Sequence, residues 1–134
     1  MTFQTFKHFH MKHLLLFAFL SLFLTNCFDA PESISEEEIH GTWVGLSYQE
    51  GETLRNDASS FGFKFLEDST YMGIYDSKQM EEGIYRLEGN KLYTTAKGLA
   101  EKNVELQYVS QDTLIMKMNR SGVIEILTLG KEEE

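Results

Sequence analysis

The sequence predicts an all-β domain, an eight-stranded antiparallel up-and-down β-barrel, from three observations. Apolar side chains from residue 39 onward alternate with a period of two rather than 3.6. Turn signals such as Gly89-Asn90 separate the apolar segments. No segment has the pattern of a crossover helix, which parallel strands require. A meander of eight short strands closes most naturally into a barrel, because closure removes exposed strand edges.

The first four strands are predicted from alternation and from the polar turns between them. Phe61, Phe63 and Phe65 share one face of the second strand, with Gly or Lys between them. Asp68-Ser69 and the segment 77–80 supply the next two turns. In order, the elements are the strand Ile39–Gln49, the polar loop Glu50–Ser60, and the strands 61–65, Tyr71–Asp76 and Glu82–Glu88.

The last four strands follow from equally short connections. Gly89-Asn90 is a strong hairpin signal, and Lys97-Gly98 opens the next connection. Gln111-Asp112 and the segment 119–122 provide the remaining turns. The predicted strands are Lys91–Thr95, Asn103–Ser110, Thr113–Met118 and Val123–Leu129.

Pairing across the turns predicts which side chains point into the barrel. A two-residue or four-residue turn at Asp68-Ser69 places Phe65 opposite Met72 and Phe63 opposite Ile74. These apolar pairs would then occupy the interior of the barrel. Lys64, between the two phenylalanines, would face outward.

In the second half of the barrel, the pairing needs two irregularities. Leu87 pairs with Leu92 across a regular hairpin. An odd-length loop or bulge at Gln111-Asp112, and a second one near Ser121, would keep apolar residues inside and turn Glu125 outward. The predicted interior set is Trp43, Phe61, Phe63, Phe65, Met72, Ile74, Tyr85, Leu87, Leu92, Leu106, Tyr108, Leu114, Met116, Met118, Ile124 and Ile126.

The N-terminal segment has the pattern of a secretory signal peptide. A basic flank precedes the apolar run 14–24, which stops at Thr25-Asn26-Cys27. Eleven residues at about 1.5 Å each are too short to span a hydrocarbon core of roughly 30 Å. Met1 and Met11 both fit as the start of such a signal. Cys27 is the only cysteine, so no disulfide within the chain is possible.

The ending Leu24-Thr25-Asn26-Cys27 resembles the lipobox of bacterial lipoproteins, in which the cysteine is lipidated and becomes the mature N-terminus. The resemblance implies a signal peptide over 1–26, a lipidated acidic tether over 27–38 and a barrel domain over 39–134. It also implies anchoring to the lipid bilayer of a bacterial cell envelope through acylated Cys27. Within the tether, Ser35 and Glu38 fit a capping box, which predicts one helical turn.

The charge of the mature chain is strongly negative. Neither Lys7 nor Lys12 would survive processing, and all 21 acidic residues follow Cys27. The balance is 10 basic minus 21 acidic residues, or −11. This argues against nucleic acid as a partner, because a phosphate backbone requires a basic patch. It leaves two interpretations, simple solubility or a basic protein partner.

Gly41-Thr42-Trp43 on the first strand is similar to the Gly-x-Trp signature of lipocalins. The segments 63–71 and 83–92 resemble the small lipocalin-like domains of bacterial lipoproteins. The resemblance implies a lipocalin-like barrel in which Gly41 and Trp43 plug one end. It further implies a lid role for the first loop and a basic residue stacked on the tryptophan, for which Lys131 is the candidate.

The sequence offers no catalytic constellation, so we expect a protein that is not an enzyme. His40 is the only histidine after Cys27, which leaves no histidine pair for zinc. No phosphate-binding loop, nucleophile elbow or calcium loop is present. We therefore expect neither a metal nor a cofactor.

Two functions remain open. In the first, the barrel holds a small apolar ligand against Phe61, Phe63, Phe65 and Tyr85. In the second, it is an acidic interaction barrel that binds a basic protein partner, as periplasmic lysozyme-inhibitor lipoproteins do. The segment 93–98 is similar to an inhibitor motif of that group. A filled barrel with an acidic surface would favour the second function, and an open cup the first.

Overall fold

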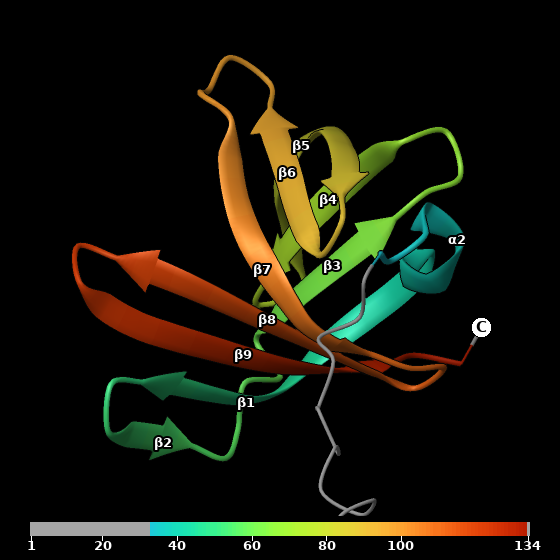
Figure 1. Cartoon of the computed structure of the whole chain (residues 1–134). Helices are drawn as coiled ribbons and strands as arrows, with labels where there is room; N and C mark the ends of the chain where they lie inside the picture. The colour runs from blue at the N-terminus through green and yellow to red at the C-terminus, as the bar shows by residue number, and fades with distance from the viewer. Residues whose placement is uncertain (1–32, 134) are drawn as a thin grey trace, which may run out of the picture.

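The computed structural model describes residues 33–133, which form one short helix and nine strands (Figure 1). The elements are α2 (Glu36–Ile39), β1 (Gly41–Glu50), β2 (Thr53–Arg55), β3 (Phe61–Phe65), β4 (Thr70–Tyr75), β5 (Lys78–Glu88), β6 (Lys91–Ala96), β7 (Lys102–Val109), β8 (Thr113–Arg120) and β9 (Val123–Lys131).

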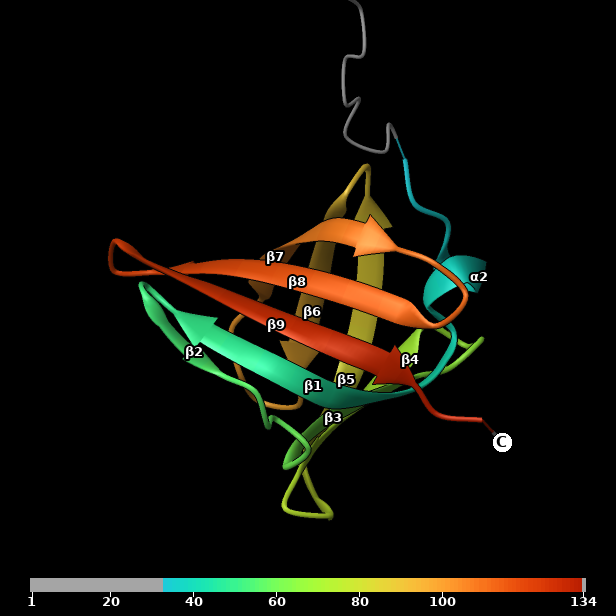
Figure 2. The same cartoon turned by 90° about the horizontal axis from the view of Figure 1, so that it is seen from below.

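Eight of these strands close a barrel. From β3 to β9 each strand pairs antiparallel with the next in the chain, and β1 pairs with β3 on one edge and β9 on the other (Figure 2). The remaining strand, β2, is not part of the barrel wall. It pairs only with the end of β1, beyond the residues that pair with β3. The predicted all-β, eight-stranded up-and-down barrel is confirmed, and the long first loop carries a small hairpin of its own.

A helical turn and its flanking residues pack against one end of the barrel. The Glu38 carboxylate accepts hydrogen bonds from the backbone N and the Oγ of Ser35, which is the predicted capping box. Ile34 and Ile39 are buried, and the Ile34 N–H donates to the carbonyl of Gly89. The segment predicted as a tether, 27–38, therefore belongs to the barrel's packing from Ile34 onward.

The predicted register between β3 and β4 is wrong by one residue. Phe65 lies opposite Tyr71, and Phe63 opposite Gly73. The turn has an odd length because Ser69 adopts a left-handed conformation with φ of 62°. Tyr71 consequently points into the core, while Met72 lies beside Lys64 on the outer face.

The predicted irregularity between β8 and β9 is also absent. Ser121 and Gly122 form a two-residue turn in which both residues have positive φ, as regular hairpins require. The regular register places Glu125 opposite Met118 and turns it inward, where its exposed fraction is 4%. The prediction that Glu125 faces outward and that Ile124 and Ile126 face inward is therefore wrong.

Two other predictions of strand register are confirmed, one fully and one in part. Leu87 does pair with Leu92 across the β5–β6 hairpin. β7 does contain a bulge, and Leu106 lies inside opposite Met116, on the face predicted for it. The bulge lies between Leu106 and Tyr108 rather than at Gln111-Asp112, so the prediction that Tyr108 faces inward is wrong, and Tyr108 is 51% exposed.

The core collects apolar side chains from α2 and from most of the barrel strands. Several of its largest members have almost no exposed surface, namely Ile39, Trp43, Phe65, Tyr71, Leu92, Leu106, Leu114 and Leu129. No helix within residues 33–133 is long and apolar enough to cross a membrane.

Candidate functional site

The two ends of the barrel differ in how they are filled. At one end, here called the closed end, lie α2, the β3–β4, β5–β6 and β7–β8 turns and the end of β9. At the other, here called the mouth, lie the end of β1, the loop 51–60 and the β4–β5, β6–β7 and β8–β9 connections. The closed end is packed with apolar side chains, whereas the mouth carries partly exposed aromatic rings and charges.

Three aromatic rings form a row at the mouth. Tyr48 on β1, Phe61 on β3 and Tyr75 on β4 come from neighbouring strands. The ring centroids of Tyr48 and Phe61 are 6.1 Å apart, and those of Phe61 and Tyr75 are 5.1 Å apart. Phe61 is 38% exposed and Tyr75 43% exposed. Both ring pairs are tilted rather than stacked, and the exposed parts of Phe61 and Tyr75 make the row an open apolar surface.

The loop 51–60 packs against β1 beside this row. Ala58 is buried, and its carbonyl accepts a hydrogen bond from the Phe61 N–H. The same carbonyl occupies the space that a Cβ on Gly45 would need. Gly45 lies on the same face of β1 as Trp43, so the glycine permits the loop's backbone to approach the inner wall.

One wall of the mouth carries a polar chain on β4, β5 and β7. The Tyr71 hydroxyl donates to Glu81 Oε1 at 3.0 Å, and Lys102 Nζ lies 3.5 Å from Glu81 Oε2. Burial, with the Glu81 carboxylate beside the hydroxyl, raises the pKa of Tyr71 to about 12. The two charged groups of this hydrogen-bonded row, Glu81 and Lys102, therefore both have a partner.

The other wall carries a carboxylate that is less well satisfied. Arg120 Nη2 lies 3.3 Å from Glu125 Oε2, yet this oxygen is buried and has no hydrogen-bond partner among the described residues. Glu125 pairs with Glu50 across β1 and β9, and Tyr48 lies on the same face. Burial raises the pKa of Tyr48, and the carboxylates of Glu125 and Glu50 add to the rise.

The predicted ligand-lining residues lie at different depths. Phe61 is at the mouth, and Phe63 stacks on Phe65 with ring centroids 6.0 Å apart. Phe65 and Tyr85 are buried at the closed end, where the rings meet edge to face at 5.2 Å. The Tyr85 hydroxyl donates to the Leu66 carbonyl, and burial raises the pKa of Tyr85 to about 12.

The other predicted site residues lie at the closed end or outside the described part. Trp43 is fully buried, and its Nε1 donates to the Ile39 carbonyl at 2.8 Å. A Cβ on Gly41, which has φ of 118°, would collide with the Lys131 side chain. Cys27 lies outside the described residues.

The sequence reasoning missed the charged residues of the mouth. Glu81 lies beside the β5 irregularity, and Arg120 lies next to the β8–β9 turn. Glu125 was missed because its neighbours Ile124 and Ile126 are apolar, so the inner face of the strand was assigned to them. The signal that identifies its true face is Ser121-Gly122, a dipeptide suited to a regular two-residue hairpin.

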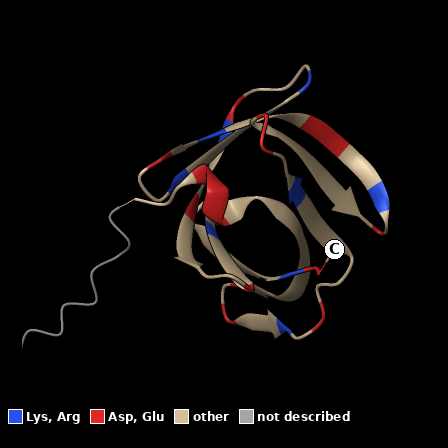
Figure 3. Ribbon diagram, turned by 90° about the vertical axis from the view of Figure 1, so that its right-hand side faces the viewer, with Lys and Arg blue, Asp and Glu red and all other residues tan. Residues whose placement is uncertain are grey.

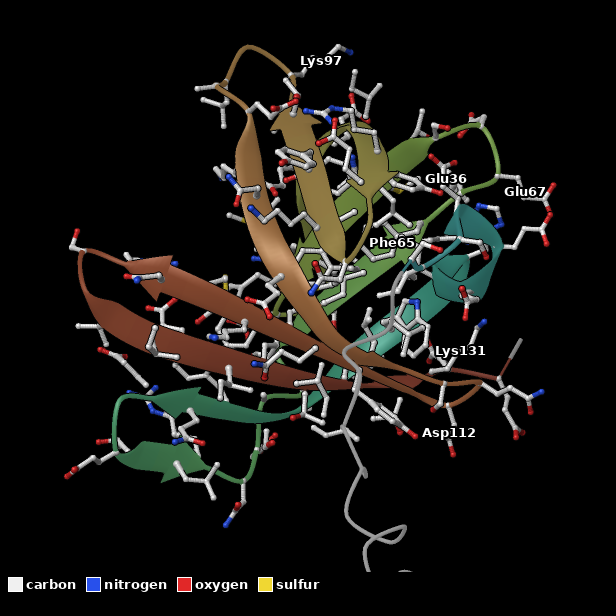
Figure 4. All side chains as sticks on the ribbon, in the orientation of Figure 1. Glu36, Phe65, Glu67, Lys97, Asp112 and Lys131 are labelled. Atoms are coloured by element: carbon white, nitrogen blue, oxygen red, sulfur yellow. The ribbon has the colours of Figure 1, made fainter. Side chains whose placement is uncertain are left out.

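The closed end has a charged outer surface. A shallow depression of about 1030 Å³ there is lined by His40, Lys64 and Lys131 and by several acidic residues. Glu36 and Asp112 lie on the same side of the barrel as Lys131 (Figure 4), and α2 is marked by its acidic residues (Figure 3). Between residues 33 and 133, no group of three or more His, Cys, Asp or Glu side chains is arranged to hold a metal ion.

Comparison with known proteins identifies the fold. The sequence matches no protein-family model and no curated protein. The structure is similar to a lipocalin-like protein from Bacteroides uniformis, with a TM-score of 0.58, 16% identity and coverage of 71% of this chain and 99% of that one. An uncharacterized protein from Bacteroides eggerthii gives a TM-score of 0.56 and 12% identity, covering 69% of this chain and 98% of that one. At these identities the likeness establishes the fold alone, a lipocalin-like barrel.

Proposed function

We propose that this protein is a non-catalytic, lipid-anchored binding module whose barrel mouth holds a small apolar ligand. The observation that carries the proposal is the row Tyr48, Phe61 and Tyr75, whose rings remain partly exposed at the mouth of a barrel that is otherwise filled. Small-molecule sites are typically concave and lined by aromatic side chains with a few polar groups. The mouth supplies both kinds of residue.

The filled core limits how far such a ligand could enter the barrel from the mouth. Phe65 and Tyr85 are already buried by their neighbours, so a ligand would contact Phe61 and the outer edge of Phe63 instead. Eight-stranded barrels are just wide enough to be filled or to hold one small ligand. A shallow site at the mouth reconciles a packed core with binding.

The proposed anchor is consistent with an accessible mouth. Only five residues lie between Cys27 and Ser33, and the six steps from one to the other span at most roughly 20 Å. The chain then enters the barrel at α2, on the closed end. An acylated Cys27 would therefore hold the closed end near the bilayer and leave the mouth facing away from it.

Ligand titration of the full-length chain tests the proposal. We expect at least one fatty acid, haem, sterol or quinone to bind with micromolar strength, about −8 kcal/mol, and to change tyrosine emission. Phe61→Ala should weaken that binding and cost less stability than the loss of a fully buried phenylalanine, since 38% of Phe61 is exposed. Tyr108→Ala is the matched control, because Tyr108 is an exposed aromatic residue on the outer face. Equal weakening by both variants, or no binder at all, would reject the mouth site.

The filled core and the charge at the closed end both favour the second function, a barrel that binds a basic protein partner. Glu67, Asp68 and Asp112 line the depression there, with Glu132 and Glu133 beside them. This acidic surface suits a basic protein partner such as a lysozyme. Reversing Glu67 and Asp68 to lysine should abolish the capture of such a partner if the closed end is the interface. The same reversal should leave ligand binding at the mouth unaffected.

A further inference from the structure

We propose that the mouth is selective for a cationic ligand, an arylalkylamine whose ammonium group forms an ion pair with the carboxylate of Glu125. This inference rests on the proposed ligand-binding function and adds the chemical class of the ligand. It starts from the one inward-facing carboxylate of the described residues that is both almost completely buried and incompletely hydrogen-bonded.

Glu125 lies on β9 among apolar neighbours. On the same face of this strand follow Leu127 and Leu129, and Met118 is its partner on β8. A carboxylate in such surroundings is stable only when donors or cations compensate for the lost water. The Oε2 atom has no such hydrogen bond within residues 33–133. The site therefore holds an acceptor that a ligand can satisfy.

Arg120 is the cation nearest to this oxygen, and it is poorly fixed. Its Nη2 lies 3.3 Å from Glu125 Oε2, but 74% of its side chain is exposed. The guanidinium itself loses little by turning outward into water, but the buried Glu125 carboxylate then needs another cation in its place. A ligand ammonium group that replaces the guanidinium would keep the charge balance around Glu125 and add hydrogen bonds to Oε2.

The surroundings of Glu125 favour a positive ligand over a negative one. Glu50 lies directly opposite Glu125 on β1, and the Tyr48 hydroxyl is 3.5 Å from Glu50 Oε2. The Tyr48 ring begins the aromatic row, whose faces attract cations as well as apolar groups. An ammonium group at Glu125 with an aromatic body against Tyr48 and Phe61 would use all of these features together.

The opposite wall does not compete for the same ligand. There the Glu81 carboxylate accepts from the Tyr71 hydroxyl and lies 3.5 Å from Lys102 Nζ. Both oxygens of Glu81 have a protein partner, unlike Oε2 of Glu125. Glu125 is therefore the residue that we expect to determine specificity.

Three probes of nearly equal size separate charge from apolar contact: phenethylamine, 2-phenylethanol and phenylacetate. Their binding to the purified full-length chain is measured by equilibrium dialysis at neutral pH. The variants are Glu125→Gln, which keeps the shape and removes the charge, and Arg120→Gln, which removes the competing cation at an exposed position. Glu52→Gln, in the exposed loop, is the matched control for the loss of one negative charge.

We expect the unaltered protein to bind the amine about tenfold or more tightly than the alcohol, and the alcohol more tightly than the anion. Glu125→Gln should remove the preference for the amine and leave alcohol binding unchanged. Arg120→Gln should strengthen amine binding, an effect that a purely structural role of the ion pair would not produce. Glu52→Gln should change nothing.

The outcomes separate a failure of this inference from a failure of the proposed ligand-binding function on which it rests. Equal binding of amine and alcohol, or a preference for phenylacetate, would overturn the inference while leaving the mouth as a ligand site. A preference for the amine that survives Glu125→Gln would overturn it as well, by assigning the recognition to another carboxylate. Failure of every probe, together with failure of the apolar panel, would instead reject the proposed function.

Discussion

Lys131 Nζ lies 5.2 Å from the centroid of the Trp43 ring, on the closed end of the barrel. The indole nitrogen donates to Ile39 at the end of α2, so the ring joins β1 to the helix while the cation comes from the end of β9. The lipocalin resemblance implied a cation on this tryptophan. Ammonium–indole contacts of this kind contribute roughly 0.5–1 kcal/mol at exposed sites. The burial of the Trp43 side chain contributes more to the stability of the barrel than this contact does.

Replacing Trp43 by alanine should destabilise the barrel by about 3–5 kcal/mol, as deletion of a large buried side chain does. The change also leaves the Ile39 carbonyl without its donor. Denaturant midpoints measure the loss. Lys131→Ala, which removes only the exposed cation, should cost less than about 1 kcal/mol. If the two variants unfold at the same midpoint, the tryptophan does not close this end.

Gly45 controls the position of the first loop. Because the Ala58 carbonyl takes the place of a Cβ there, Gly45→Ala should push the loop away from β1 and cost about 1–3 kcal/mol. Arg55 in that loop should then be cleaved faster by trypsin. Glu52→Ala is the control, because Glu52 is exposed in the same loop and its backbone has no positive φ. An unchanged cleavage rate at Arg55 in Gly45→Ala would show that the loop is not held by this contact.

The architecture was predictable because alternation is a local property. The residues Phe61, Phe63 and Phe65 predict a strand whatever follows them, and eight such segments with short turns predict a closed meander. Register was not predictable in the same way. It depends on the conformation of single turn residues, such as the left-handed Ser69, and one residue of difference exchanges the two faces of a strand.

The mouth was harder to predict than the fold for the same reason. Apolar side chains were assigned to the interior, so the inward position went to Ile124 and Ile126 instead of Glu125. Burial is a sound criterion for the closed end, where Phe65 and Leu92 are indeed inside. It fails at the mouth, where the inner wall carries charges, which is typical of functional sites.

The proposed anchor leads to a direct experiment. Cys27→Ser should yield a protein that carries no acyl chain and no longer partitions into the detergent phase. Two or three acyl chains anchor a protein stably, whereas a single chain is marginal. Metabolic labelling with a fatty acid measures the modification. Label that still appears on the serine variant would exclude Cys27 as the lipidated residue.

The buried Tyr71 hydroxyl should make stability depend on pH in the alkaline range. Its pKa is about 12 in the folded chain against an ordinary value of about 10, so between these values the unfolded chain loses the proton while the folded chain keeps it. The stabilisation is complete below pH 10 and is lost as pH rises toward 12. Tyr85 has a similarly raised pKa, so Tyr71→Phe should reduce the decline in unfolding free energy without abolishing it. Denaturant unfolding of both proteins between pH 9 and 12 measures the difference, and parallel curves would show that Tyr71 titrates normally in the barrel.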